Sequence, residues 1–149
     1  MNTVKIEKEI KASPQEVWDI ISDIEKAPDW VEVMNSLVDT TDNPVKKGTV
    51  YKERSKVGPK ESVTTWRVTK FVAPQIQIHE CNEPDFKAHL TMKLEPTHGG
   101  TKLTHITKYE LMPNLRPLGW LLETLFVKSA MIKNLNKSVD NCKAIIEAK

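Results

Sequence analysis

The chain has 149 residues, of which 39% are hydrophobic and 28% are charged, and this composition is typical of a globular protein and too apolar for a disordered one. Its length predicts a single domain, residues 1–149, whose core needs neither disulfides nor metals. The net charge of +2 comes from 22 basic and 20 acidic residues mixed along the chain, so nucleic acid is not expected as a partner.

The N-terminal segment TVKIEKEIKA predicts a β-strand, because Val4, Ile6 and Ile10 share one parity and would lie on one buried face. The same segment alternates in charge and lacks the apolar region of a signal peptide. No run of about 18 apolar residues occurs in the chain, so no membrane span is expected.

A short amphipathic helix is predicted next. Ser13 and Glu16 form a capping-box pattern, with Pro14 at the first helical position. The apolar residues that follow at helical spacing are Val17, Ile20, Ile21 and Ile24. We expect Pro28 to interrupt this helix and a second short turn to form in DWVEVM.

Six further strands are predicted between about Leu37 and Leu111. They are separated by turn-forming sequences, namely DNPVKKG, VGPK, VAPQ, NEPD and THGG. Strands so closely spaced, without helices between them, pair antiparallel as successive hairpins.

The alternation of apolar residues predicts the register of these hairpins. Across THGG the expected pairs are Leu94 with Leu103, Met92 with His105, Leu90 with Thr107, Ala88 with Tyr109, and Phe86 with Leu111. Across VAPQ the expected pairs are Val68 with Ile76 and Trp66 with Ile78. Across VGPK they are Tyr51 with Trp66 and Glu53 with Thr64. One continuous inner face results.

The remaining sequence predicts one long amphipathic helix from near Pro117 to the C-terminus. Its expected apolar stripe is Leu118, Leu122, Leu125, Ser129, Ile132, Val139, Cys142 and Ile146. The predicted inner face of the sheet also carries polar groups, namely Tyr51, Glu53, Thr64, Glu80, His105, Thr107 and Tyr109. Burying such groups in a dry core is unfavourable, so a partly hydrated cavity under the helix is predicted.

The chain resembles the START-like superfamily, also called SRPBCC or helix-grip proteins, which includes the birch-pollen-allergen type and the polyketide cyclase/dehydrase and lipid-transport group. The segments that carry the resemblance are IKASPQEVWDIISDIEKAPDW, KKGTVYKE, TTWRVTKFVAPQIQI and the C-terminal helix. The resemblance implies an α+β fold, in which a bent seven-stranded antiparallel sheet wraps a long C-terminal helix. Two short helices follow the first strand, and a hydrophobic cavity lies between sheet and helix.

The function expected from this cavity is the binding or transport of a lipid, isoprenoid, quinone or polyketide-like molecule, without a cofactor. Trp18 is expected in the core, and Trp30 either in the core or at the cavity rim. The expected ligand-binding residues are Trp30, Tyr51, Trp66, Ile78, Leu90, Met92, His105, Tyr109, Leu122, Leu125, Phe126 and Ile132.

An enzyme of the polyketide cyclase, aromatase or dehydratase type is the alternative that the resemblance permits. His105 would transfer protons, and Glu53, Glu80 and Tyr109 are the other candidates. Motifs of nucleophilic catalysis and phosphate binding are absent, which disfavours an enzyme that uses a cofactor. A protein-interaction or chaperone-regulator domain is a further alternative, and it predicts a filled cavity.

Other groups have simpler interpretations. His79, Cys81 and His89 would meet on the outer face, but such a site lacks supporting ligands, so no metal is expected. Trp120–Val127 is apolar on nearly every side, and burial is preferred there to transient membrane contact. Cys81 and Cys142 form no CxxC pair, which favours reduced thiols in a cytoplasmic protein, expected as a monomer or weak dimer.

Overall fold

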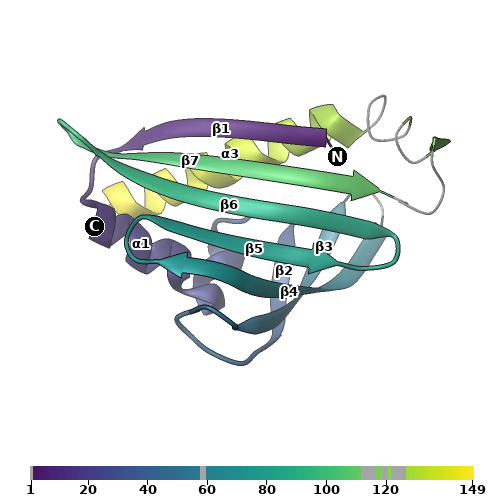
Figure 1. Cartoon of the computed structure of the whole chain (residues 1–149). Helices are drawn as coiled ribbons and strands as arrows, with labels where there is room; N and C mark the ends of the chain where they lie inside the picture. Colours follow the sequence, from purple (N-terminus) through teal and green to yellow (C-terminus); the bar gives the residue numbers. More distant parts are fainter. Residues whose placement is uncertain (1, 58–59, 112–116, 119–120, 122–126) are drawn as a thin grey trace.

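A seven-stranded antiparallel sheet, a long C-terminal helix and two short helices make up the fold (Figure 1). The computed structural model describes residues 2–57, 60–111, 117–118, 121 and 127–149. The strands are β1 (Asn2–Ile10), β2 (Met34–Thr40), β3 (Val50–Val57), β4 (Lys60–Val72), β5 (Ile76–Asn82), β6 (Phe86–Thr97) and β7 (Gly100–Leu111). Their order in the sheet is β1-β7-β6-β5-β4-β3-β2. The fold predicted from sequence is confirmed.

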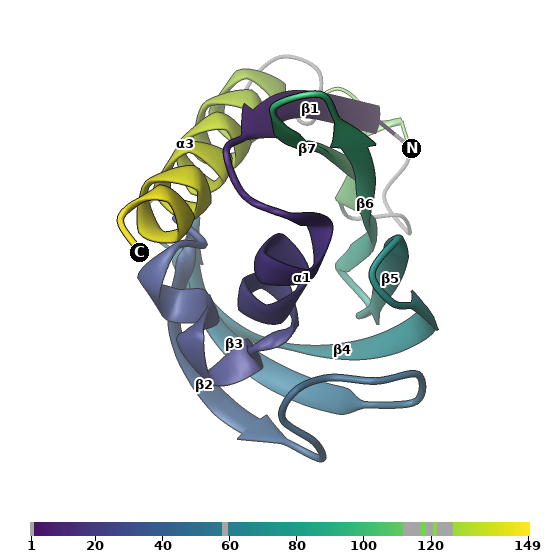
Figure 2. The same cartoon turned by 90° about the vertical axis from the view of Figure 1, so that its left-hand side faces the viewer.

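The first helix, α1 (Pro14–Ser22), begins at the predicted capping box. The Ser13 side chain accepts a hydrogen bond from the backbone N–H of Glu16, and the Glu16 carboxylate accepts one from the backbone N–H of Ser13. Figure 2 shows α1 lying across one end of the curved sheet. α1 also contacts α3, β6 and β7, so it packs between the sheet and the C-terminal helix at this end.

The second short helix lies earlier than predicted. A 3₁₀ helix, η1 (Ile24–Asp29), includes Pro28, and the strand β2 begins soon after it. Pro28 does not break this helix, because the bonds from Lys26 N–H to the carbonyl of Asp23 and from Trp30 N–H to the carbonyl of Ala27 do not use the nitrogen of proline. The turn expected in DWVEVM is present as a single turn, in which the Met34 N–H donates to the Val31 carbonyl at 3.1 Å just before β2 begins.

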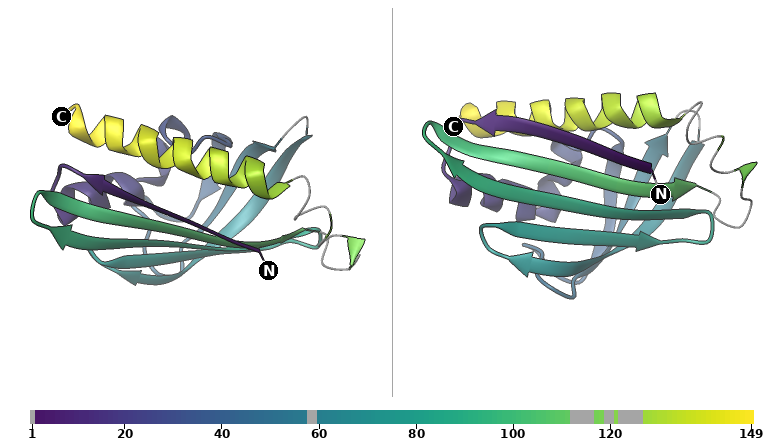
Figure 3. Two further views of the ribbon diagram at one scale, coloured as in Figure 1. Left: turned by 90° about the horizontal axis from the view of Figure 1, so that it is seen from above. Right: turned by 45° about the horizontal axis from the view of Figure 1, so that its top comes forward.

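The C-terminal helix α3 (Lys128–Glu147) covers the inner side of the sheet beside β1 (Figure 3). Lys143 Nζ donates to the backbone carbonyl of Glu9 at 2.9 Å, and Lys8 pairs with Asp140 at 2.8 Å. The side chains buried on this helix are Ser138, Val139, Cys142 and Ile146. Most of the stretch between Pro117 and α3, including Leu122, Leu125 and Phe126, lies outside the described residues.

The phase of the apolar stripe on α3 differs from the prediction at its first turns. Met131 and Leu135 face the cavity, whereas Ser129 and Ile132 are exposed. A helix turns about 100° per residue. A prediction that places Ile132 rather than Met131 on the inner side therefore rotates the apolar stripe by about that angle. The inward orientation expected of Ile132 is wrong.

The predicted register is confirmed in two hairpins. All five expected pairs between β6 and β7 are present, and so are the pairs of Tyr51 with Trp66 and of Glu53 with Thr64 between β3 and β4. The pairing of β2 with β3 at the sheet edge is irregular, because the register shifts between Met34 and Ser36 and again between Leu37 and Asp39.

The predicted register between β4 and β5 is wrong. Trp66 pairs with Cys81 and Val68 with His79, three residues further along β5 than predicted, because β4 continues to Val72 and the turn lies at residues 73–75. The register also shifts by one residue between Val68 and Lys70. An extra residue in one strand turns the following side chains to the opposite face. Ile78 and Glu80 consequently lie on the outer face of the sheet.

Candidate functional site

A cavity of about 500 Å³ lies between the inner face of the sheet and α3. Apolar side chains from η1, β4, β6 and α3 form most of its wall. The exposed lining residues Ser62, Val63 and Asp85 show that it opens at the end away from α1. Its size lies within the range of about 300 to 1,000 Å³ that is common for small-molecule sites.

Seven of the predicted ligand-binding residues line this cavity. They are Trp30, Tyr51, Trp66, Leu90, Met92, His105 and Tyr109. The six that lie on strands share one parity within their hairpins, so the sequence pattern places their side chains on the inner face, whereas Trp30 directly follows η1. Among the four catalytic candidates, Glu53, His105 and Tyr109 are also lining residues.

The other predicted residues lie elsewhere. Ile78 is on the outer face, Ile132 is on the exposed side of α3, and Leu122, Leu125 and Phe126 lie outside the described residues. Glu80 is on the outer face as well, where its carboxylate lies 2.9 Å from His89 Nδ1. The inward orientation predicted for Glu80 is therefore wrong.

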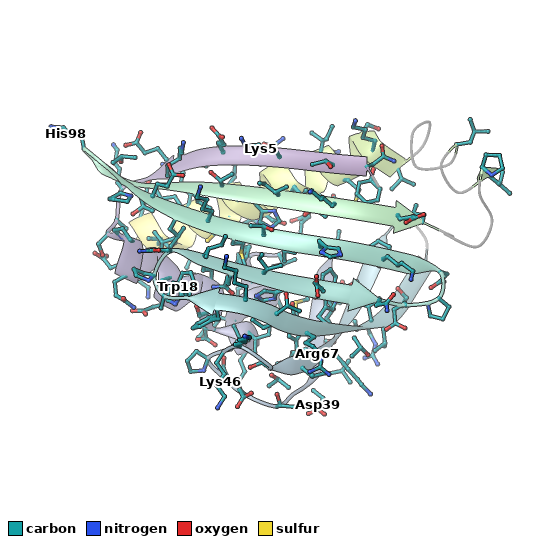
Figure 4. All side chains as sticks on the ribbon, in the orientation of Figure 1. Lys5, Trp18, Asp39, Lys46, Arg67 and His98 are labelled. Carbon is teal, nitrogen blue, oxygen red and sulfur yellow. The ribbon has the colours of Figure 1, made fainter. Side chains whose placement is uncertain are left out.

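Trp18 and Trp30 occupy different positions relative to the cavity. Trp18, labelled in Figure 4, is buried on α1, as predicted. The centroids of its ring and that of Phe71 lie 4.9 Å apart. Trp30 is also buried, yet it belongs to the cavity wall. The two short helices thus fill the closed end with one indole and line the cavity with the other.

His79 is the main cavity residue that the sequence pattern missed. It is buried and lines the cavity from β5. The sequence signal for its orientation is the apolar spacing in WRVTKF, where Trp66, Val68 and Phe71 are separated by two and then three positions. That change of spacing is typical of a β-bulge.

His79 is part of a buried chain of hydrogen bonds. The Tyr51 hydroxyl lies 2.7 Å from His79 Nδ1, and His79 Nε2 lies 2.8 Å from Gln77 Oε1. Gln77 Nε2 donates to Ser22 Oγ at 3.2 Å. Because Gln77 uses its nitrogen on Ser22 and its oxygen on His79, His79 donates from Nε2 and accepts from Tyr51 at Nδ1. The chain connects the end of α1 to the cavity wall.

Burial keeps both inner histidines neutral. It lowers the pKa of His79 to about 3, with the nearby His105 as the second cause, and it lowers the pKa of His105 to about 4. Neither imidazole therefore adds positive charge to the cavity at neutral pH.

We expect His79 and His105 to remain neutral when the pH is lowered from 8 to 5.5. The measurement is the titration of ¹⁵N chemical shifts of the imidazole rings, assigned with His79→Gln and His105→Gln. In urea both should titrate near the ordinary value of about 6.5. An imidazolium signal from either residue in the folded protein at pH 5.5 would contradict the expectation.

The carboxyl group of Glu53 lies in the wall of the cavity, and its pKa is raised above the ordinary value. Burial raises the pKa of Glu53 to about 7, against the opposing effect of a hydrogen bond from Ser55 Oγ at 3.1 Å. Burial, followed by the charge of Glu53, also raises the pKa of Tyr51. A carboxyl group with this pKa exchanges protons near neutral pH.

The outer-face metal site that was considered for His79, Cys81 and His89 does not assemble. His79 and Cys81 are buried on the inner side, whereas His89 is exposed on the outer side. Over the ranges that the structure describes, no three His, Cys, Asp or Glu residues are grouped to hold a metal ion. Within those same ranges, no helix combines the length and the apolar character that crossing a membrane requires.

A family model and a relative from Mycobacterium tuberculosis match this chain. A family model described as "Polyketide cyclase / dehydrase and lipid transport" matches residues 1–147. The uncharacterized protein Rv1546 of Mycobacterium tuberculosis is 23% identical over 104 residues, which cover 69% of this chain and 73% of that protein.

Solved structures share the fold at low sequence identity. The structure of TTHA0849 from Thermus thermophilus has a TM-score of 0.82 and 20% identity, with 99% of this chain and 98% of that chain covered. The di-domain aromatase/cyclase StfQ of the steffimycin biosynthetic pathway has a TM-score of 0.78 and 12% identity, with 98% of this chain and 50% of that chain covered.

Proposed function

The chain belongs to the polyketide cyclase/dehydrase and lipid transport family, and from this premise we propose that it binds or transports a hydrophobic or amphipathic small molecule in its cavity. The observation that carries the proposal is an unfilled space of about 500 Å³ with a largely apolar wall. Native interiors are close-packed, so a space of this size favours a bound guest. Lipids, isoprenoids, quinones and polyketide-like compounds are the classes proposed.

The proposal predicts that the protein purified from its own host carries such a molecule. Native mass spectrometry should show an added mass that disappears after solvent extraction, and the extract should contain an apolar compound. The control is the variant Leu90→Trp, which narrows the cavity and should co-purify without the added mass. A wild-type protein that is empty, and that binds no apolar probe after purification, would contradict the proposal.

A cyclase or dehydratase activity is the second candidate, because Glu53 has a pKa of about 7 inside the cavity and a neutral His105 lies in the same wall. Such groups suit proton transfer. Replacing His105 by Ala separates the two functions once the guest is identified. A carrier keeps most of its affinity, whereas an enzyme loses turnover by about 10²-fold or more.

A protein-interaction domain was expected to have a filled cavity. The unfilled cavity therefore supports the proposal of a ligand-binding protein over that alternative. The buried free thiols of Cys81 and Cys142 support the proposal that the protein works in the reducing cytoplasm. We propose that it does so as a monomer or weak dimer.

A further inference from the structure

A second hollow in the protein surface lies beside α1. It is a groove of about 600 Å³ that is lined by α1, by the loop between β2 and β3, and by the turn between β4 and β5. Trp18 and Lys46, both labelled in Figure 4, belong to its lining, and none of its described lining residues also lines the central cavity. The groove is therefore a separate candidate site, and its size is typical of small-molecule sites.

Apolar side chains in the lining of the groove are accessible to a ligand. Phe71 is half-buried, and Pro44 and Ala73 are exposed. Trp18 packs against Phe71, with 4.9 Å between their ring centroids, and holds that ring in place. A flat apolar group that packs on these side chains is removed from water, which favours binding.

The polar lining of the groove carries excess negative charge. Asp19 is exposed and Asp23 is half-buried, and both line the groove. The one lysine in the described lining, Lys46, lies 3.4 Å from the carboxylate of Asp42. Three carboxylates are thus grouped with one lysine, although the whole chain has a net charge of +2. The C-terminal end of α1, which has no basic residue in its last turn, adds a partial negative charge. The groove therefore favours a cation.

Hydrogen bonds fix the walls of the groove relative to each other. Asn43 Nδ2 donates to Asp23 Oδ1 at 3.1 Å, and Asn43 Oδ1 accepts from the Ile24 N–H at 2.9 Å. The Val45 N–H donates to the Ser22 carbonyl at 2.9 Å. The loop between β2 and β3 is held in this way against the end of α1. A ligand that enters the groove does not have to order the loop first, which favours its affinity.

We propose that the groove binds a small organic ammonium ion, with its charge beside Asp19 and Asp23 and a flat apolar body against Phe71. A bare metal ion does not fit, because in the described part of the chain no three acidic, histidine or cysteine side chains are grouped to hold one. The cation has to bring apolar surface of its own, which the accessible side chains of the groove then cover. This site is separate from the guest of the central cavity, so the inference does not rest on the proposed function.

The test compares tryptamine with tryptophol, which has the same number of non-hydrogen atoms but a hydroxyl in place of the ammonium group. Both are titrated calorimetrically into the full chain at pH 7.5 and low salt, where tryptamine is protonated. Tryptamine should bind at least about fivefold more tightly than tryptophol, and high salt should reduce this difference. Equal affinities at low salt, or no binding of tryptamine, would overturn the inference.

Competition with Nile red, an uncharged dye chosen to report on the central cavity, separates the two sites. Saturating tryptamine should leave the affinity for the dye within about twofold of its value without tryptamine, because a ligand in the groove does not occupy the cavity. Competitive displacement of the dye would place the amine in the cavity and overturn the inference. If the dye fails to bind while tryptamine binds, the proposed function of the cavity fails and the inference about the groove stands.

Asp19→Asn removes one charge while keeping the side-chain oxygen that accepts a hydrogen bond from Gln15 Nε2 at 2.7 Å. It should weaken tryptamine binding about threefold and leave tryptophol binding unchanged. The matched control is Glu83→Gln, which removes a carboxylate from the lining of the central cavity and should change neither affinity. An equal loss of tryptamine affinity in both variants would show that the net charge of the protein, and not the groove, attracts the amine.

Lys46→Gln tests the charge of the groove in the opposite direction. It removes the lysine from the lining and should strengthen tryptamine binding about threefold, because a like charge is taken away. The control is Lys133→Gln, at an exposed position on α3 outside the groove, which should leave the affinity unchanged. Equal effects of the two substitutions would contradict binding in the groove.

Discussion

Leu90→Trp is expected to lower the affinity for Nile red about 70-fold, the largest effect on binding that we predict for one substitution. Leu90 faces the cavity from the middle of β6, between His79 on β5 and Thr107 on β7. An indole at this position fills space that the dye would occupy. If the dye loses about 100 Å² of buried apolar surface, about 2.5 kcal/mol of binding free energy is lost.

The control for this prediction is His89→Trp, which adds the same side chain to the outer face of the same strand. His89 is exposed and contacts Glu80, and a surface ion pair contributes little to stability. Nile red fluorescence titrations of both variants, with circular dichroism to establish folding, give the result. Equal affinity in the two variants would show that the dye binds outside the cavity.

Glu53→Gln is expected to stabilise the fold more at pH 8 than at pH 5, by a difference of about 2 kcal/mol. The pKa of Glu53 is about 7 in the folded protein, against an ordinary value of 4.5. The folded state therefore holds this proton more tightly than the unfolded state. In the wild type, the bound proton of Glu53 stabilises the folded state at low pH, and this stabilisation is lost as the pH rises from about 4.5 to 7. Glutamine does not titrate, so the variant does not lose stability in this way.

Urea unfolding of wild type and variant at both pH values measures the difference. His79 and His105 act in the opposite direction, because their pKa values are lowered by burial and acid favours the unfolded state. Both proteins contain these histidines, so their effect cancels in the comparison. The control is Glu80→Gln on the outer face, which should change stability by less than about 1 kcal/mol. A gain from Glu53→Gln that is independent of pH would contradict the assigned pKa.

The sequence pattern predicted the order of the elements and much of the cavity wall, because regular strands have a period of two and short turns restrict their register. The wrapping of the sheet around the C-terminal helix was expected from the resemblance to START-like proteins. Tyr51, Trp66, Leu90 and His105 were placed on the inner face by this argument alone. Their hairpins contain no extra residue between the turn and the cavity, so the parity of the side chains is preserved along each strand.

The prediction was wrong where a single residue interrupts that parity. The β-bulge near Thr69 turns His79 inward and Ile78 outward. The prediction for Ile132 was wrong for a related reason, since a one-residue error in helical phase moves a side chain by about 100°. The spacing of apolar residues predicts which face of a strand or helix a side chain lies on only when the whole element is regular.

The acid–base properties of the site could not be predicted from sequence. The pKa of Glu53 depends on how completely the folded wall removes it from water, and the hydrogen-bonded chain through His79 joins residues from α1, β3 and β5. These are consequences of packing between distant segments, and no local pattern contains them.

The irregular pairing of β2 with β3 has a consequence for self-association. A strand at the edge of a sheet exposes backbone groups that recruit strands from other molecules and start aggregation. Because β2 shifts register twice within Met34–Thr40, its outward N–H and C=O groups do not form a long regular row. This edge is therefore a poorer template for a strand from another molecule than a regular edge strand of the same length would be.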